Sequence, residues 1–173
     1  LMITFPIKAF ALIEVDITRG NLNPLPLAVS PLSIDDKSKK SFEKILKKEN
    51  IGSEISSIVE NNLRTSGLFN PISKDAFLQA PDIANLKPRF EDWNLIKAQA
   101  LITGKVTYVD EKLRVEFRLW DILAAKEMMA LAFTTVPSNW RRVGHIISDK
   151  VYERLTGEKG YFDTRIIYVA EEG

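Results

Sequence analysis

The chain of 173 residues is long enough for one domain that buries its own hydrophobic core. Hydrophobic residues make up 45% and charged residues 27% of it, which is the composition of a globular protein and excludes a wholly disordered one. The formal net charge is only +1, so the molecule as a whole is not drawn to nucleic acid or membranes, and any such binding must come from a local patch.

The amino-terminal segment has the pattern of an export signal. Residues 1–11 (LMITFPIKAFA) are mostly apolar and end in Ala9, Phe10 and Ala11, a small-x-small pattern of the kind that signal peptidase cleaves. We interpret these residues as a residual secretory signal, and the alternative is a strand that leads into the fold. No apolar run elsewhere in the sequence reaches the roughly 18 residues of a membrane span.

Two extended segments follow. Ile13, Val15 and Ile17 alternate with polar residues, which predicts a short strand with one apolar face. After a break at residues 20–24, residues 25–29 (LPLAV) form a second extended segment. The prolines around it favour the edge of a sheet, because proline cannot donate a hydrogen bond to a neighbouring strand.

A lysine-rich stretch then covers residues 36–49, with six lysines interleaved with acidic residues. Such a run is usually a solvated loop or the solvated face of a helix, and a binding patch is the alternative.

The first well-defined helix begins after this stretch. Asn50 is a suitable cap, Gly67 is a suitable left-handed stop, and apolar residues recur between them at helical spacing: Ile51, Ile55, Ile58, Val59 and Leu63. A short extended piece at residues 68–72, a helical turn at 74–78 and a further helical segment at 90–98 are expected next.

The middle of the chain predicts an antiparallel meander of three strands. In its central strand, Leu113, Val115, Phe117 and Leu119 alternate with residues that are mostly charged, so one face is apolar and the other is expected to meet solvent. Residues 101–109 form the strand before it, and residues 129–133 form the strand after it.

A second long helix opens at residues 137–139 and closes at Gly157. Its apolar stripe is expected to pack on the apolar face of the sheet and consists of Trp140, Val143, Ile147, Val151 and Leu155. Residues 161–170 (YFDTRIIYVA) then have the pattern of another strand, and a domain boundary is expected between residues 157 and 160.

The sequence offers little to catalysis. The single histidine, His145, lies away from the apolar stripe and is expected to be exposed, with Asp149 one helical turn later as a possible surface partner. One histidine and no cysteine make a zinc site improbable on ligand count alone. Glycine-rich phosphate-binding motifs and the serine elbow of hydrolases are missing from the sequence. Arg141 and Arg142 beside Trp140 offer a weak nucleic-acid contact.

Several segments together resemble one known family. The sequence WRRVGHIISDKVYERLTG at residues 140–157, followed by GYFDTRIIYV at 160–169, resembles the end of the TolB amino-terminal domain. SGLF at residues 66–69, Phe90 and Trp93, ALITGKV at 100–106 and FRLWD at 117–121 match the family in order and spacing. The resemblance therefore covers almost the whole chain.

The resemblance implies an α+β fold, with two main helices packed on one face of a mixed or antiparallel sheet. This fold is similar to the anticodon-binding domains of some synthetases, a similarity that by itself implies no RNA function. Residues 12–159 would form the TolB amino-terminal α+β domain. Residues 160–173 would begin the six-bladed β-propeller that follows it in the family.

The resemblance also implies a function. Members of the family are periplasmic, non-enzymatic adaptors of the Tol-Pal system, without a cofactor, and support outer-membrane integrity, cell division and macromolecule import. Their amino-terminal segment contacts the C-terminal domain of TolA, and their propeller contacts the lipoprotein Pal. Here the TolA-contacting segment corresponds to Leu12, Ile13, Glu14, Val15, Asp16, Ile17, Thr18, Arg19 and Gly20.

Two points are left open. The lysine-rich stretch at residues 36–49 is longer than the family pattern, and its role is not implied by the resemblance. The main rival function is a nucleic-acid-binding module of the anticodon-domain type, and a third is an uncharacterised hydrolase. Export would separate them, because a processed periplasmic chain disfavours an RNA-binding role.

Overall fold

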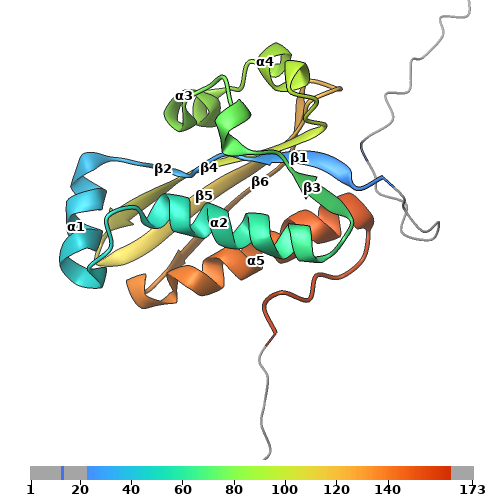
Figure 1. Ribbon diagram of the computed structural model, residues 1–173. Coiled ribbons are helices and arrows are strands. Elements are labelled where there is room, and N and C mark those ends of the chain that lie inside the picture. The colour runs from blue at the N-terminus through green and yellow to red at the C-terminus, as the bar shows by residue number, and fades with distance from the viewer. Residues whose placement is uncertain (1–12, 14–22, 165–173) are drawn as a thin grey trace, which may run out of the picture.

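A computed structural model describes residue 13 and residues 23–164 of the chain (Figure 1). One mixed sheet organises these residues, with the strand order β3-β1-β4-β5-β6 and β2 paired beside β4. The strands are β1 (Leu25–Val29), β2 (Ser33–Ile34), β3 (Phe69–Pro71), β4 (Ala100–Val109), β5 (Lys112–Asp121) and β6 (Lys126–Thr135). β1 runs parallel to β3 and β4, β2 runs parallel to β4, and β4, β5 and β6 form the predicted antiparallel meander.

The helices lie on both sides of this sheet (Figure 1). They are α1 (Asp36–Leu46), α2 (Ile51–Thr65), α3 (Pro81–Leu86), α4 (Phe90–Leu95) and α5 (Trp140–Thr156), with single 3-10 turns η1 (Lys74–Ala76) and η2 (Pro137–Asn139). The predicted helices α2 and α5 are confirmed. Asn50 caps α2 by accepting the Ser53 N–H at 3.2 Å, and α5 ends at Gly157 with a left-handed φ of 75°. The lysine-rich stretch is largely a helix, α1.

The expectation that β1 lies at an edge of the sheet is wrong. β1 pairs with β3 on one side and β4 on the other, and Leu27 is fully buried. Proline is tolerated because the pairing with β4 starts only at Leu27, opposite Ala100. Pro26 therefore precedes that ladder, and its carbonyl still accepts the Gln99 N–H at 2.9 Å.

The main core lies between the sheet and the pair of long helices, as predicted. All five residues of the apolar stripe of α5 are buried, and they share one cluster with Phe117 and Leu119 of β5. α2 lies beside α5 across this face (Figure 1). Gly144 allows the close approach, because a Cβ at this position would lie only 2.8 Å from Cγ2 of Ile58.

The opposite face is partly covered, which the charged alternation along β5 did not predict. α3 and α4 lie on this side, where Trp93 and Trp120 are buried in a small second cluster. Trp120 follows the charged residues Arg114, Glu116 and Arg118 on this face of β5, where the sequence predicts contact with solvent. Its ring instead packs edge-on against Phe90 with centroids 5.9 Å apart, and its indole N–H donates to Thr103 Oγ1 at 2.9 Å.

The remainder of that face is polar. Glu116 of β5 pairs with Lys105 and Arg114, each at 3.1 Å. Burial acts to raise the pKa of Glu116, but the hydrogen bonds and charges of these two cations outweigh it and hold the pKa below its ordinary value.

The fold is the expected α+β arrangement, with two main helices on one face of a mixed sheet. In the described residues, no helix combines the length and apolar character needed to cross a bilayer.

Candidate functional site

The predicted partner-binding segment touches the described domain at one residue. Of the nine predicted residues, Ile13 is described, whereas Leu12 and residues 14–20 lie outside the described residues. Ile13 is half-buried and packs against the main core cluster. Its backbone N–H also donates to Oδ2 of Asp121 at 3.3 Å. The fold therefore holds one point of this segment against its own core.

Asp121, the partner of Ile13, occupies an unusual position for a carboxylate. It ends β5 and is only 1% exposed. Its second oxygen, Oδ1, accepts the Ala124 N–H at 2.8 Å in the turn before β6. A buried carboxylate needs such donors to offset the loss of water. One donor comes from the neighbouring turn and the other from residue 13, which no local sequence pattern could reveal.

The last described residues, 158–164, form a return segment that lies against α5. Asp149 of α5 accepts the Phe162 N–H at 2.7 Å and the Asp163 N–H at 3.1 Å. Gly160 lies so close that a Cβ would be 2.4 Å from Cα of Asp149. The suggested surface pair between His145 and Asp149 is therefore wrong, because the Asp149 carboxylate is used by this segment.

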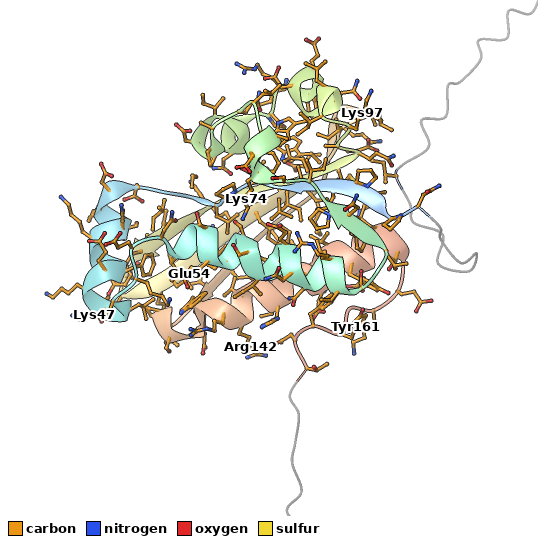
Figure 2. The ribbon with its side chains drawn as sticks, in the orientation of Figure 1. Lys47, Glu54, Lys74, Lys97, Arg142 and Tyr161 are labelled. Atoms are coloured by element: carbon orange, nitrogen blue, oxygen red, sulfur yellow. The ribbon has the colours of Figure 1, made fainter. Side chains whose placement is uncertain are left out.

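A second contact fixes the same segment. Arg142 binds Asp163 through two parallel hydrogen bonds, Nε to Oδ1 at 3.0 Å and Nη2 to Oδ2 at 3.1 Å. These bonds and the charge of Asp163 raise the pKa of Arg142 above its ordinary value. Figure 2 shows Arg142 and Tyr161 along the lower edge of the molecule, where the return segment runs back beside α5. Residues 161–164 form no strand, and the rest of the strand predicted at 161–170 lies outside the described residues.

His145 is half-buried between α2 and α5 and not exposed as predicted. Its Nδ1 lies 2.9 Å from Nδ2 of Asn62, which also donates to Ser148 Oγ at 2.9 Å. The helical-wheel argument considered only the sheet as a neighbour of α5. The flank of α5 meets α2 as well, so a residue away from the apolar stripe becomes part of a helix–helix contact.

Two pockets among the described residues lack an arrangement suited to acid–base chemistry. A pocket of about 200 Å³ lies between β6 and α5, and its charged residue is Arg142, already paired with Asp163. A smaller one of about 150 Å³ lies beside Phe90 and Ile122, with Glu91 as its charged residue. General acid–base catalysis needs a positioned pair of titratable groups, which neither lining supplies. Within the described ranges, no cluster of histidine and carboxylate side chains could hold a metal ion.

The suggested nucleic-acid contact also changes in the structure. Trp140 is 4% exposed, and Lys48 and Arg141 lie over its ring at 5.1 Å and 4.3 Å from the centroid. A ring that is buried and already contacted by two cations is not open for a base to stack on it. Arg142 is engaged by Asp163. The observed role of this group is therefore to attach the start of α5 to the end of α1.

Comparison with known proteins gives a consistent result. The TolB amino-terminal domain model matches residues 13–128. The chain is 86% identical over all 173 residues to the Tol-Pal system protein TolB of Pelagibacter ubique (strain HTCC1062), of which it spans 39%. The crystal structure of TolB from Acinetobacter baumannii matches with a TM-score of 0.65 and 23% identity, over 82% of this chain and 30% of that one.

These matches differ in what they support. At 23% identity, the solved structure shows the fold alone. The family model covers more than half of the chain, and the match to the relative includes all 173 residues of this chain. The chain spans about two fifths of that curated relative, so the activity of the longer protein is not carried over by similarity alone. The chain belongs to the TolB amino-terminal domain family.

Proposed function

We propose that this domain is a non-enzymatic, periplasmic adaptor of the Tol-Pal system that contacts the C-terminal domain of TolA through residues 12–20. The family membership supports the system, and the relative at 86% identity bears the system's name. The observation that carries the proposed contact is the docking of Ile13 on the core and on Asp121. It gives one residue of the segment, Ile13, a defined place in the free domain from which a partner can withdraw it.

Capture of the segment would occur by strand addition. An extended segment with alternating apolar and polar residues can pair its backbone with the edge of another sheet, while alternate side chains enter pockets. Ile13, Val15 and Ile17 supply that alternation. Docking on the domain and capture by TolA then compete, so the affinity for TolA falls by the fraction of molecules whose segment is docked.

The proposal extends to the regions flanking the domain. Residues 1–11 would be the residual secretory signal, residues 12–159 the adaptor domain, and residues 160–173 the start of a propeller that binds Pal in the longer relatives. Asp149 and Arg142 hold residues 162 and 163 on α5, and Phe162 packs against the main core cluster, so the described start of this last stretch lies against the adaptor domain. The wider roles in outer-membrane integrity, cell division and import follow from membership of the system.

The test is a titration of the TolA C-terminal domain with three chains: one that starts at Leu12, one that starts at Asn23, and one that starts at Leu12 with Val15→Pro. The proline removes a backbone donor and distorts the strand. We expect the first chain to bind and the other two to lose binding while each still melts as a folded domain. Equal affinity of all three chains would place the contact elsewhere.

Asp121→Asn tests the competition separately. The asparagine oxygen can still accept the Ala124 N–H, but an amide NH2 then faces the Ile13 N–H, donor against donor. Loss of docking should increase the affinity for TolA, provided that the melting temperature shows a folded domain. An unchanged or weaker affinity would mean that docking and capture do not compete.

A further inference from the structure

The lysine-rich stretch forms a cationic row on α1 that neither the fold nor the proposed TolA contact uses. Lys37, Lys40 and Lys44 follow one another at spacings of three and four residues, which places them on one face of the helix. Lys47 continues the row as the C-cap residue, with a left-handed φ of 56°. All four side chains are exposed. The row extends over about 15 Å along the helix axis, at about 1.5 Å per residue.

The helix that carries the row is anchored to the sheet through its opposite face. On the opposite face of α1, Phe42 is fully buried and packs edge-on against Tyr108 of β4, with ring centroids 5.4 Å apart. Ser38 accepts the Tyr108 N–H at 2.8 Å and donates to the capping carboxylate of Asp35 at 2.7 Å. The helix face that carries the lysines is therefore turned away from the domain.

The row has no ionic partner among the described residues. Among the described residues, none of the four lysines forms an ion pair, whereas Lys48 next to the row pairs with Glu54 at 2.7 Å. The acidic residues of the same helix, Asp36 and Glu43, lie beside the row without pairing to it. Residues 36–49 contain six lysines and three acidic residues. This is a local excess of three positive charges in a chain whose net charge is +1.

We propose that this row is a docking surface for the anionic headgroups of a phospholipid bilayer. Four exposed lysines on one helix face form the kind of basic cluster that anionic bilayers attract. The domain would then rest on a membrane surface while its amino-terminal segment, at another part of the fold, stays available to TolA.

The chemistry of the row favours a bilayer over nucleic acid. The row contains no arginine, the residue suited to two-point recognition of individual phosphates, and lysine acts as a point charge. The aromatic ring of α1, Phe42, is buried and offers no stacking surface to a base. A diffuse anionic surface requires neither property, because it attracts by summed charge alone.

The test is binding of the full chain to vesicles of phosphatidylglycerol and phosphatidylcholine in equal parts, measured by co-sedimentation. The variant carries Lys37→Gln, Lys40→Gln, Lys44→Gln and Lys47→Gln, and glutamine has nearly the helix propensity of lysine. The matched control changes four exposed lysines from separate parts of the fold to glutamine: Lys87, Lys97, Lys112 and Lys126. Figure 2 shows Lys97 at the opposite end of the molecule from Lys47.

Both variants lose four positive charges, so net charge alone predicts equal effects. Each lysine near an anionic surface contributes about 1 kcal/mol, or roughly fivefold in partitioning. We expect the row variant to bind at least about tenfold more weakly than the unmodified chain, and the control less than about threefold more weakly. Binding should also weaken as salt screens the charges.

Three results would overturn the proposal. They are no binding of the unmodified chain to anionic vesicles, equal losses in the two variants, or row-dependent binding to a single-stranded RNA oligomer without binding to vesicles. None of them bears on the contact with TolA, which is measured with the amino-terminal variants.

Discussion

One face of the sheet packs against α2 and α5 and the other against α3 and α4, and the two faces depend on different contacts. On the first, 23 buried residues form one apolar cluster in the described part of the chain. On the second, six residues do so, and polar bonds of buried aromatic rings complete the packing. Gln79 accepts the Trp93 indole N–H at 2.9 Å and the Arg89 backbone N–H at 3.2 Å.

The two faces are expected to differ in how well they tolerate the loss of a single side-chain contact. Apolar burial is spread over many side chains, so the first face unfolds only when a substitution buries a charge or leaves a large cavity in its core. The second face relies on individual hydrogen bonds whose removal leaves a buried donor without a partner. It already contains one unsatisfied atom, since Oδ1 of buried Asn85 in α3 has no hydrogen-bond partner among the described residues. We therefore expect α3 and α4 to open more readily than α2 and α5.

The largest effect is expected from Val143→Asp in the centre of the first face. Val143 is 2% exposed in the main cluster, so the variant buries a carboxylate without a partner. The cost of several kcal/mol is a large part of a typical stability of about 5 to 15 kcal/mol, and the domain should unfold. Circular dichroism during heating measures this effect. Val136→Asp, the same change at a residue 51% exposed before α5, is the control and should melt near the unmodified chain.

Gln79→Met tests the second face. Methionine has a similar volume but leaves the indole N–H of Trp93, 1% exposed, without its acceptor, which should cost about 1 to 3 kcal/mol. Hydrogen exchange should accelerate at residues 77–98 and remain slow in α2 and α5. Gln99→Met is the control, since the Gln99 side chain makes no hydrogen bond within the described part. If exchange accelerates equally on both faces, they unfold as one unit and the comparison fails.

The same contrast explains what could be predicted from sequence. The first face is encoded by periodicity, because an alternating strand and two helical stripes can be buried only against each other. This pattern predicts α2, β5 and α5, and the structure confirms all three. The second face carries less of this signal. α4 confirms the helical segment expected at residues 90–98, but α3 has only six residues, too few for a helical stripe, and was not predicted. The key contacts of this face, such as Trp120 with Thr103, join residues that no local pattern relates.

The candidate site shows the same limit. The alternation at Ile13 predicted a strand-like segment, but its docking partner Asp121 lies 108 residues later and could not be found from spacing. The role of Asp149 was likewise hidden, because its partners are backbone N–H groups of the return segment, and every residue except proline carries such a group.

His145→Ala measures what one polar contact contributes on the apolar face. The variant removes one acceptor of Asn62, whose amide keeps Ser148 as a partner. We expect the free energy of unfolding to fall by about 0.5 to 1 kcal/mol, less than for Gln79→Met, because no fully buried donor is left unpaired. Urea unfolding of the two variants side by side gives the ranking. A larger loss for His145→Ala would contradict the view that hydrogen bonds matter more on the face with the smaller core.

The smallest effect is expected at the rim of the first face, where Asp35 caps α1. Its Oδ1 accepts the Ser38 N–H at 2.9 Å and its Oδ2 accepts the Ser38 hydroxyl at 2.7 Å. These hydrogen bonds hold the pKa of Asp35 below the ordinary value of 3.8. A carboxyl group whose pKa is lowered in the folded state stabilises the fold above the unfolded pKa, and this stabilisation is lost as the pH falls through the folded pKa.

Asp35→Asn keeps an oxygen that can cap the helix but removes the titrating charge. At neutral pH we expect the variant to be less stable by about 0.5 kcal/mol, because asparagine is nearly as good a cap as aspartate. At about pH 3 the difference should shrink, since the unmodified chain then loses the contribution of its carboxylate. Urea unfolding at both pH values tests this. A difference that stays constant with pH would show that the cap acts through its hydrogen bonds alone, and the charge of Asp35 would then add nothing to the attachment of α1 to β4.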